Sequence, residues 1–246
     1  MTKIFISHNA IINLYKKPSL QSEITTQLLY GESFSLIKRN NKWFKIKIKE
    51  DGYIGFIPKI KLKPYMKPTH KIHKLKAKIY KSPNKKNKIG ELPFGSKFKI
   101  YKKSLKFVKF DKGWIEKKNI KPLKFRDKDL FIRAKHFKNI KYKWGGKTYK
   151  GIDCSALIQI LLNFNNRFCP RDTKDQVKYF SKNIISKKIK KNDLIYWKGH
   201  VAIIISKQKL IHAYGPMKKT MIMKISRTIK RIKETANLKV VGYRRV

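Results

Sequence analysis

The chain has 246 residues, 41% of them hydrophobic, so it can bury two small cores and one larger core. No uninterrupted apolar stretch is long enough to cross a bilayer as a helix, which excludes a helical membrane protein. The 63 Lys and Arg residues against 14 Asp and Glu give a formal charge of +49, so nonspecific attraction to polyanions is expected.

The N-terminal half contains one sequence unit twice. The first copy reads Leu14-Tyr15-Lys-Lys-Pro18, Tyr30-Gly31-Glu-Ser-Phe34, Trp43-Phe-Lys-Ile46 and Gly55-Phe-Ile57. The second copy reads Ile79-Tyr80-Lys-Ser-Pro83, Phe94-Gly95-Ser-Lys-Phe98, Phe107-Val-Lys-Phe110 and Gly113-Trp-Ile115. Short alternating segments broken by Pro, Gly and Asn predict two small β-barrels, at residues 1–62 and 77–124. The basic, proline-containing segment 63–76 is predicted to be a linker.

The next informative feature is Cys154, which stands where an apolar, helix-period run begins after a glycine-rich loop. A cysteine in the first turn of a helix lies near the positive end of the peptide dipoles, which lowers its pKa. Glycines before it leave backbone room for a substrate. Cys154 is therefore a candidate nucleophile, and the alternative is a small core residue. Cys169 precedes Pro170 without a nearby histidine, and we interpret it as structural.

Two histidines follow in a predicted β-hairpin. The segment 199–205 is dense in β-branched residues, and residues 209–214 follow after a short polar turn. If the hairpin folds about Ser206, Ala202 faces Leu210 and His200 faces His212, with the two imidazoles on one face. This pairing suggests that His200 is a general base and that His212 orients its ring.

These features occur within an ordered set of short motifs. The fragments are Tyr142-x-Trp144-Gly-Gly, Gly151-x-Asp153-Cys154-Ser155-x-Leu157-x-Gln159, Pro170-Arg171-Asp172-Thr173-x-x-Gln176, Asp193-Leu-Ile195, Gly199-His200-Val201 and Ile211-His212-Ala213. Together they resemble the NlpC-type papain-like cysteine peptidases that cut bacterial cell-wall peptides. The resemblance implies an α+β catalytic domain over residues 125–246, in which a helix carrying the cysteine packs on an antiparallel sheet. It also implies cleavage of the γ-D-glutamyl bond to a diamino acid in murein peptides.

The resemblance assigns substrate contacts to several further residues of this half. Tyr142 would place its hydroxyl near the developing oxyanion, beside the backbone N–H of Cys154, although a packed loop tyrosine is the alternative. Asp153 would help to bind a substrate ammonium group and is also a good helix N-cap. The other positions that match substrate-facing residues are Ser155, Asp172 and Thr173. Arg171 could bind a carboxylate or anchor its loop, and the sequence leaves both open.

The two N-terminal repeats look like bacterial SH3-like barrels. In the two-barrel peptidases that this chain resembles, the first barrel closes over the active site and recognises the free amino group of the substrate's L-alanine. The matching residues are Glu32 and Tyr53, and a free ammonium needs such acceptors. The second repeat has Ser96 at the position of Glu32 and Lys112 near that of Tyr53, so the repeat itself requires neither residue. A solvated turn carboxylate and a packed aromatic are the alternatives.

We expect a cytoplasmic protein that needs no cofactor or metal. The first apolar run is too short and too polar for a signal segment, and two unmatched cysteines fit a reducing compartment. Such an enzyme would meet short murein peptides that begin with free L-Ala-γ-D-Glu during cell-wall recycling. The expected partner is therefore a small murein peptide, while the sequence leaves the oligomeric state open.

Other functions remain as alternatives. One is an inactive or secreted wall protein whose barrels bind peptidoglycan, and another is a different acyl-transfer or amidase reaction on the same fold. Nonspecific nucleic-acid binding would follow from the charge alone. However, only nine basic residues are Arg and the Lys residues are spread over the whole chain, which fits codon bias better than a dedicated nucleic-acid surface.

Overall fold

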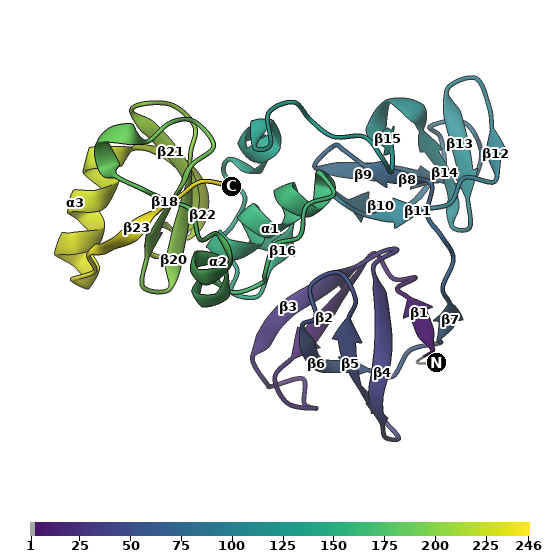
Figure 1. Cartoon of the computed structure of the whole chain (residues 1–246). Helices are drawn as coiled ribbons and strands as arrows, with labels where there is room; N and C mark the ends of the chain where they lie inside the picture. The colour runs from purple at the N-terminus through teal and green to yellow at the C-terminus, as the bar shows by residue number, and fades with distance from the viewer. Residues whose placement is uncertain (1–2) are drawn as a thin grey trace. The chain divides into compact units, whose positions relative to one another are not determined.

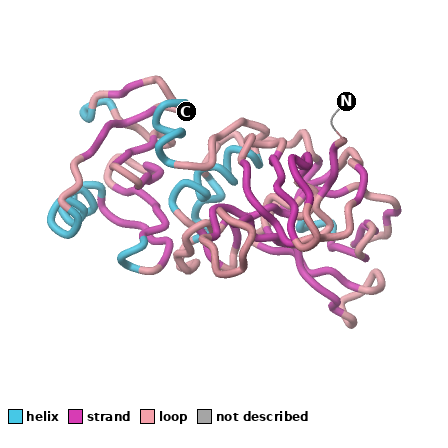
Figure 2. Tube along the Cα trace, turned by 90° about the horizontal axis from the view of Figure 1, so that it is seen from below, coloured by secondary structure: helices cyan, strands magenta, loops and turns pink. Residues whose placement is uncertain are grey.

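A computed structural model of the protein describes residues 3–246, which divide into two compact units, residues 3–125 and 126–246. In Figure 1 the N-terminal unit, purple to teal, is built from strands, whereas the α-helices carry the green and yellow of the C-terminal unit. Figure 2 shows the same elements coloured by secondary structure. Over residues 3–246, the helices are all too short or too polar to cross a membrane.

The first repeat, which we call the first module, forms one antiparallel sheet in the order β3-β2-β6-β5-β4-β1-β7. Its strands are β1 (Ile4–Ile6), β2 (Ile11–Tyr15), β3 (Ile24–Leu29), β4 (Ser33–Arg39), β5 (Trp43–Ile48), β6 (Ile54–Pro58) and β7 (Lys63–Pro64). In β5 the side chains of Phe44, Ile46 and Ile48 alternate inward and are buried. This alternation gives the module its own apolar core.

The second repeat, the second module, uses two antiparallel sheets, in the orders β10-β9-β14-β13-β12 and β11-β8-β15. Its elements are β8 (His70–Ile72), β9 (Lys76–Tyr80), β10 (Lys88–Pro93), β11 (Lys97–Phe98), β12 (Lys102–Lys103), β13 (Phe107–Phe110), β14 (Gly113–Glu116), the 3-10 helix η1 (Lys117–Asn119) and β15 (Ile120–Pro122). A separate cluster of buried residues, including Ile72, Leu92 and Ile115, forms its core. The repeat therefore produces two all-β modules with separate cores.

Part of the segment expected to be a linker is strand. β7 pairs with β1, and β8 pairs with both β11 and β15. Lys71 in β8 is buried, and its Nζ donates to the carbonyl of Phe125 at 2.7 Å. Unpaired backbone groups at the edge of a sheet gain hydrogen-bond partners when a neighbouring segment pairs with them. This explains why part of segment 63–76 forms strands instead of an unstructured linker.

The C-terminal unit contains a six-stranded antiparallel sheet in the order β18-β23-β19-β20-β21-β22. Its helices are η2 (Ile132–Phe137), α1 (Cys154–Phe164), α2 (Thr173–Tyr179), η3 (Ser186–Lys188), η4 (Gly215–Met217) and α3 (Ile225–Ala236). Its strands are β16 (Lys147–Thr148), β17 (Gly151–Ile152), β18 (Asn183–Ile184), β19 (Leu194–Trp197), β20 (His200–Ile204), β21 (Lys209–Tyr214), β22 (Lys219–Lys224) and β23 (Val240–Arg244). The expected α+β class, with α1 packed against β20 and β21, is confirmed.

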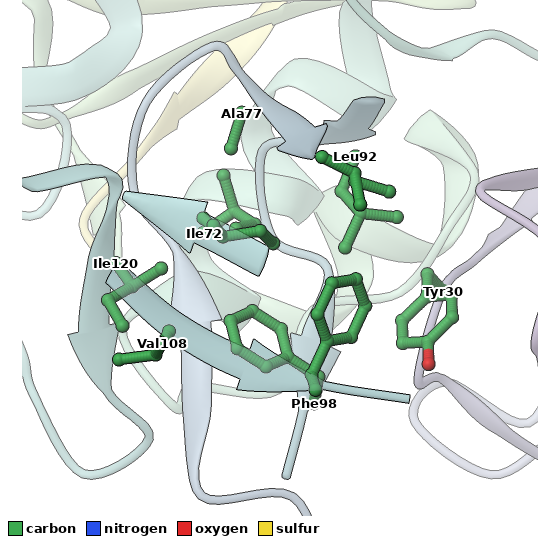
Figure 3. Packing of buried hydrophobic residues seen from close by; sticks show 10 residues of the cluster. Tyr30, Ile72, Ala77, Leu92, Phe98, Val108 and Ile120 are labelled. Carbon is green, nitrogen blue, oxygen red and sulfur yellow. The ribbon is translucent and has the colours of Figure 1, made fainter. Parts of the chain in front are cut away.

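The two modules meet through a polar and aromatic contact within the N-terminal unit. Tyr30 of the first module is part of the core cluster of the second module, and its ring centroid lies 5.7 Å from that of Phe110. Figure 3 shows Tyr30 reaching from the first module to a position beside Phe98. The Tyr30 hydroxyl donates to Asp111, whose other oxygen lies 2.9 Å from Nδ1 of His8. The junction therefore combines apolar burial with a shared carboxylate.

Gly31 makes the closest backbone approach at this junction. Its φ of +77° is left-handed, and a Cβ placed on it would lie 1.9 Å from the carbonyl oxygen of Lys97. The backbone N–H of Lys97 also donates to the carbonyl of Tyr30 at 2.9 Å. Only glycine fits both the backbone angle and the contact.

Gly31→Ala should therefore destabilise the N-terminal unit more than Gly52→Ala. Gly52 has a similar φ of +74°, but a Cβ there would meet only Cε of Lys47, at 3.7 Å. Left-handed strain alone costs about 1 kcal/mol, whereas Gly31→Ala should cost roughly 3 kcal/mol because backbone must also move. Urea titrations of both variants measure the difference in the free energy of unfolding. Equal losses would mean that the close approach contributes nothing.

Candidate active site

The candidate nucleophile is held by a deeply buried helix. α1 begins at Cys154 because the side chain of Asp153 accepts a hydrogen bond from the backbone N–H of Ala156 at 2.8 Å, as an N-cap does. Ten of the eleven residues of α1 are buried, so its rotation is fixed by packing on nearly every side. The Sγ of Cys154 therefore has a defined position at the N-terminal end of this helix.

A buried ion pair supports the same end of α1. The guanidinium of Arg171 bonds to both carboxylate oxygens of Asp153 and, at 2.8 Å, to Oγ of Ser155. Asp153 also accepts the backbone N–H of Gly145 at 2.9 Å. These contacts join the glycine loop, the helix start and the segment before α2, so Arg171 anchors its loop.

The same contacts bear on the expected substrate role of Asp153. Oδ1 accepts from Ala156, Ser155 and Arg171, and Oδ2 accepts from Gly145 and Arg171. Both oxygens are therefore engaged within the protein, and the side chain is only 5% exposed. A substrate ammonium would have to displace one of these donors, so the N-cap role is the one that the geometry supports.

The Cys154 sulfur lies among groups from three other segments. Sγ is 3.9 Å from the carbonyl oxygen of Gly199, the residue before His200. The side chain of Thr173 hydrogen-bonds to it and favours the thiolate. Burial raises the pKa of Tyr142, and the negative forms of Cys154 and Asp153 raise it further. The structure therefore brings Tyr142, Thr173 and the start of β20 to the cysteine.

The protonation state of Cys154 differs from the expectation. Burial, followed by the charge of Asp153, raises the pKa of the thiol to about 11, against the lowering expected from its place in the helix. A helix dipole contributes about 0.3–1 kcal/mol at most sites. Desolvation of a fully buried thiolate is larger and decides the direction. The sequence could not reveal this burial because it depends on segments distant along the chain.

The hairpin register differs from the prediction by two residues. Ile203 pairs with Ile211 and Ile204 with Leu210, so Ala202 is opposite His212 rather than Leu210. A shift of one residue would turn a strand over, but a shift of two leaves every side chain on its expected face. The two histidines remain on one face as diagonal rather than direct neighbours.

The imidazoles of His200 and His212 nevertheless meet. Nε2 of His200 lies 2.9 Å from Nδ1 of His212, within hydrogen-bonding distance. Burial lowers the pKa of His200 to about 4 and lowers that of His212 as well, with His200 as a second cause. At neutral pH both rings are therefore uncharged, which suits one as a proton acceptor and the other as its orienting partner.

Two aromatic residues that the sequence analysis missed surround the histidine pair. Tyr214 stacks on His212 with a centroid distance of 4.8 Å and an interplanar angle of 12°. Trp197 lies 5.5 Å from His200, measured between ring centroids. Trp197 ends β19 and Tyr214 ends β21, the two strands on either side of β20. Their rings restrict the orientation of the imidazoles. Their strand positions could have identified them only once the true register was known.

The remaining candidates of the C-terminal unit lie around the start of α2. Ser155 is buried, and its carbonyl accepts a hydrogen bond from Nε2 of Gln176 at 2.9 Å. Asp172 precedes Thr173, the first residue of α2, and burial raises the pKa of its carboxyl. Ser155 and Thr173 thus join the Cys154 environment, whereas Asp172 stands next to Arg171, whose charge opposes that rise.

The turns that carry Glu32 and Tyr53 adjoin at one end of the first module. Glu32 lies in the turn between β3 and β4, is 4% exposed, and accepts the backbone N–H of Leu29 at 2.8 Å through Oε2. Tyr53 lies in the turn between β5 and β6 and packs against the module's core. The two turns adjoin because the backbone N–H of Ser33 donates to the carboxylate of Glu50, at 3.0 and 3.1 Å.

Two parts of the chain match known protein families. Residues 139–235 match the NlpC/P60 family, and residues 14–62 match the bacterial dipeptidyl-peptidase SH3 domain. A crystal structure of an NlpC/P60 family protein from Bacillus cereus superposes with a TM-score of 0.82 and covers 99% of each chain at 19% identity. The fold, including both N-terminal modules, is therefore that of the crystallised protein.

Similar curated proteins extend over most of the chain. A γ-D-glutamyl-L-lysine dipeptidyl-peptidase of Bacillus subtilis is 26% identical over 233 residues, which cover 84% of this chain and 77% of the relative. A dipeptidyl-peptidase 6 of Lysinibacillus sphaericus is 25% identical, covering 83% of this chain and 87% of the relative. The similarity thus spans the SH3-like part and the cysteine-bearing part together.

Arg171→Gln should strongly destabilise the C-terminal unit. The substitution leaves Asp153 buried without its cation, and breaking a buried pair in this way costs about 3–5 kcal/mol. Lys230→Gln is the matched control, because its partner Glu234 is solvent-exposed on α3 and no measurable change is expected. Urea titrations compare the two, and equal stability of both variants would remove the anchoring role of Arg171.

The reactivity of Cys154 toward iodoacetamide should rise with pH well beyond neutrality. Because burial keeps the thiol protonated, the alkylation rate should still be increasing above about pH 9, measured by mass spectrometry in a Cys169→Ala background. Cys169 is the other free cysteine, and its removal makes the label specific. A plateau already reached near neutral pH would instead indicate a stable thiolate–imidazolium pair with His200.

Proposed function

Because the chain combines an NlpC/P60 cysteine peptidase domain with a bacterial dipeptidyl-peptidase SH3 domain, we propose that it hydrolyses peptides of peptidoglycan. The bond that we assign is the γ-D-glutamyl bond to a diamino acid in peptides that begin with a free L-alanine. The names of the Bacillus subtilis and Lysinibacillus sphaericus relatives support a dipeptidyl-peptidase reaction. We assign this reaction to cell-wall peptide recycling.

The observation that carries the chemistry is the placement of Cys154 beside the start of β20, where His200 meets His212. A nucleophile, a base and an orienting group are the components of a papain-like triad. In our assignment, His200 Nε2–H donates to Nδ1 of His212 and leaves Nδ1 of His200 to accept the thiol proton. The stacked ring of Tyr214 keeps His212 in the plane that this bond requires.

The reaction then proceeds by general base and nucleophilic catalysis. His200 removes the proton as Sγ of Cys154 attacks the γ-glutamyl carbonyl carbon, and the carbonyl oxygen becomes an oxyanion. The backbone N–H of Cys154, in the first turn of α1, and the hydroxyl of Tyr142 are assigned to stabilise it. His200 next protonates the leaving amine of the diamino acid. Water, deprotonated by His200, hydrolyses the thioester and releases L-Ala-D-Glu.

Recognition of the free amino group is assigned to the first module. Glu32 supplies a carboxylate and Tyr53 a phenol for the ammonium, and the adjoining turns bring them to the same end of that module. Ser155, Asp172 and Thr173 are proposed to contact the remaining peptide, and a contribution of Asp153 would compete with its bonds to Arg171. The cytoplasmic location expected from the sequence remains a prediction.

The test is cleavage of two tripeptides, L-Ala-γ-D-Glu-L-Lys and L-Ala-γ-D-Glu-meso-diaminopimelate, each with a free and with an acetylated amino terminus. Mass spectrometry should detect L-Ala-D-Glu only from the free-amine forms. Cys154→Ala should abolish cleavage without unfolding the protein. Glu32→Gln should lower kcat/KM for the free-amine peptides by roughly tenfold or more, as expected for the loss of a charge-assisted contact.

Each contrary result would favour a different function or remove a different residue role. Equal cleavage of free and acetylated peptides would remove the amine-recognition role and favour a hydrolase of the intact wall. Activity that persists in Cys154→Ala would remove the assigned nucleophile. Binding of peptidoglycan without cleavage of any peptide would favour the inactive wall-binding alternative.

A further inference from the structure

A second carboxylate, that of Glu50, lies beside the turn that carries Glu32 in the first module. Glu50 follows β5, and its carboxylate accepts the backbone N–H of Ser33 through both oxygens and the Ser33 hydroxyl at 3.3 Å. Ser33 is the residue next to Glu32, so Glu50 is tied to the turn that carries Glu32. Its side chain is 17% exposed, which leaves it little contact with solvent.

The two carboxylates interact electrostatically. Burial raises the pKa of Glu50, and the negative charge of Glu32 raises it further. The backbone N–H of Ser33 and the ammonium of Lys97 oppose this rise. The electrostatic potential that a ligand meets near Glu32 therefore depends on Glu50 and Lys97, because each added or removed charge changes it.

The compensating ammonium comes from the second module. Nζ of Lys97 lies 3.4 Å from Oε1 of Glu50, and the Lys97 side chain is 21% exposed. The backbone of Lys97 is fixed by its bond to the carbonyl of Tyr30 and by the close approach of Gly31. The junction between the modules thus fixes the backbone of Lys97 close to Glu50, so their ion pair is not a flexible surface contact.

We propose that Glu50 and Lys97 are positioning residues that set the net charge around Glu32 and thereby make the second module part of substrate recognition. The bonds of Glu50 to the Ser33 N–H and to the Lys97 ammonium favour its ionised form, and two carboxylates with one ammonium then leave a single net negative charge at this end of the first module. A net negative site attracts a substrate ammonium even though the chain as a whole carries +49. The inference rests on the proposed role of Glu32 in binding that ammonium.

Glu50→Gln is the first variant. It keeps an oxygen that can accept the Ser33 N–H but removes the charge, so Lys97 then cancels Glu32 and the local net charge becomes zero. KM for the free-amine tripeptide should rise on the order of fivefold to tenfold with kcat little changed, as one unit charge at a partly buried site implies. Glu23→Gln, which breaks an exposed pair with Lys16 elsewhere in the first module, is the matched control and should leave KM unchanged.

The sign of the effect is tested by removing the ammonium instead. At a pH above the pKa of Glu50 in this variant, Lys97→Met leaves two uncompensated carboxylates, so KM measured there should fall below that of the wild type. The double variant Glu50→Gln/Lys97→Met restores one net negative charge and should recover most of the loss seen in Glu50→Gln. A purely structural role of Glu50 predicts no such rescue, because the double variant would then be at least as impaired as the single one.

A titration of the labelled Glu side-chain carboxyls by 13C NMR checks the coupling without any substrate. The charged groups acting on Glu50 are Lys97 and Glu32, so its pKa should rise in Lys97→Met and fall in Glu32→Gln. Unchanged titrations, or a KM for Glu50→Gln equal to that of the wild type while Glu32→Gln is impaired, would overturn this inference alone. If the wild type cleaves no murein tripeptide, the proposed function fails, and this inference fails with it.

Discussion

The buried ion pair between Asp153 and Arg171 constrains the whole catalytic end of the C-terminal unit. One carboxylate caps α1, holds the glycine loop through Gly145 and receives the guanidinium that fixes the segment before α2. Cys154 follows the cap directly, so its position depends on all of these bonds. Since both ions are buried, neither can be lost without leaving an uncompensated charge. Cys154, the proposed nucleophile, is therefore positioned by electrostatics and by the packing of α1 together.

The same burial that fixes the nucleophile also keeps it uncharged. The pKa of Cys154 is raised and that of His200 is lowered, so the resting pair consists of a neutral thiol and a neutral imidazole. In the proposed mechanism charge develops only when the substrate carbonyl is present to receive the sulfur. His212 and the stacked Tyr214 hold the base in place for that step.

In the N-terminal unit, the junction between the modules has a comparable organising role. Tyr30 lies in the core of the second module, and Gly31 allows the backbones to approach closely. Glu32 comes next in the chain. The junction therefore fixes the position of the residue that is proposed to bind the substrate ammonium. Lys97 reaches Glu50 from the other side of the same contact. If Glu50 and Lys97 act as proposed, this arrangement gives the second module a part in substrate recognition that its own sequence does not suggest.

The repeat, the helix that begins at Cys154 and the two histidines on one face could be predicted from the chain alone, because local periodicity and short motifs encode them. It also indicated the peptidase family from motif order. The hairpin register, the pairing of Arg171 with Asp153 and the raised pKa of Cys154 became visible only in the folded chain. These depend on which distant segments exclude water from one another, and desolvation and ion pairing between such segments have no local signature in the chain.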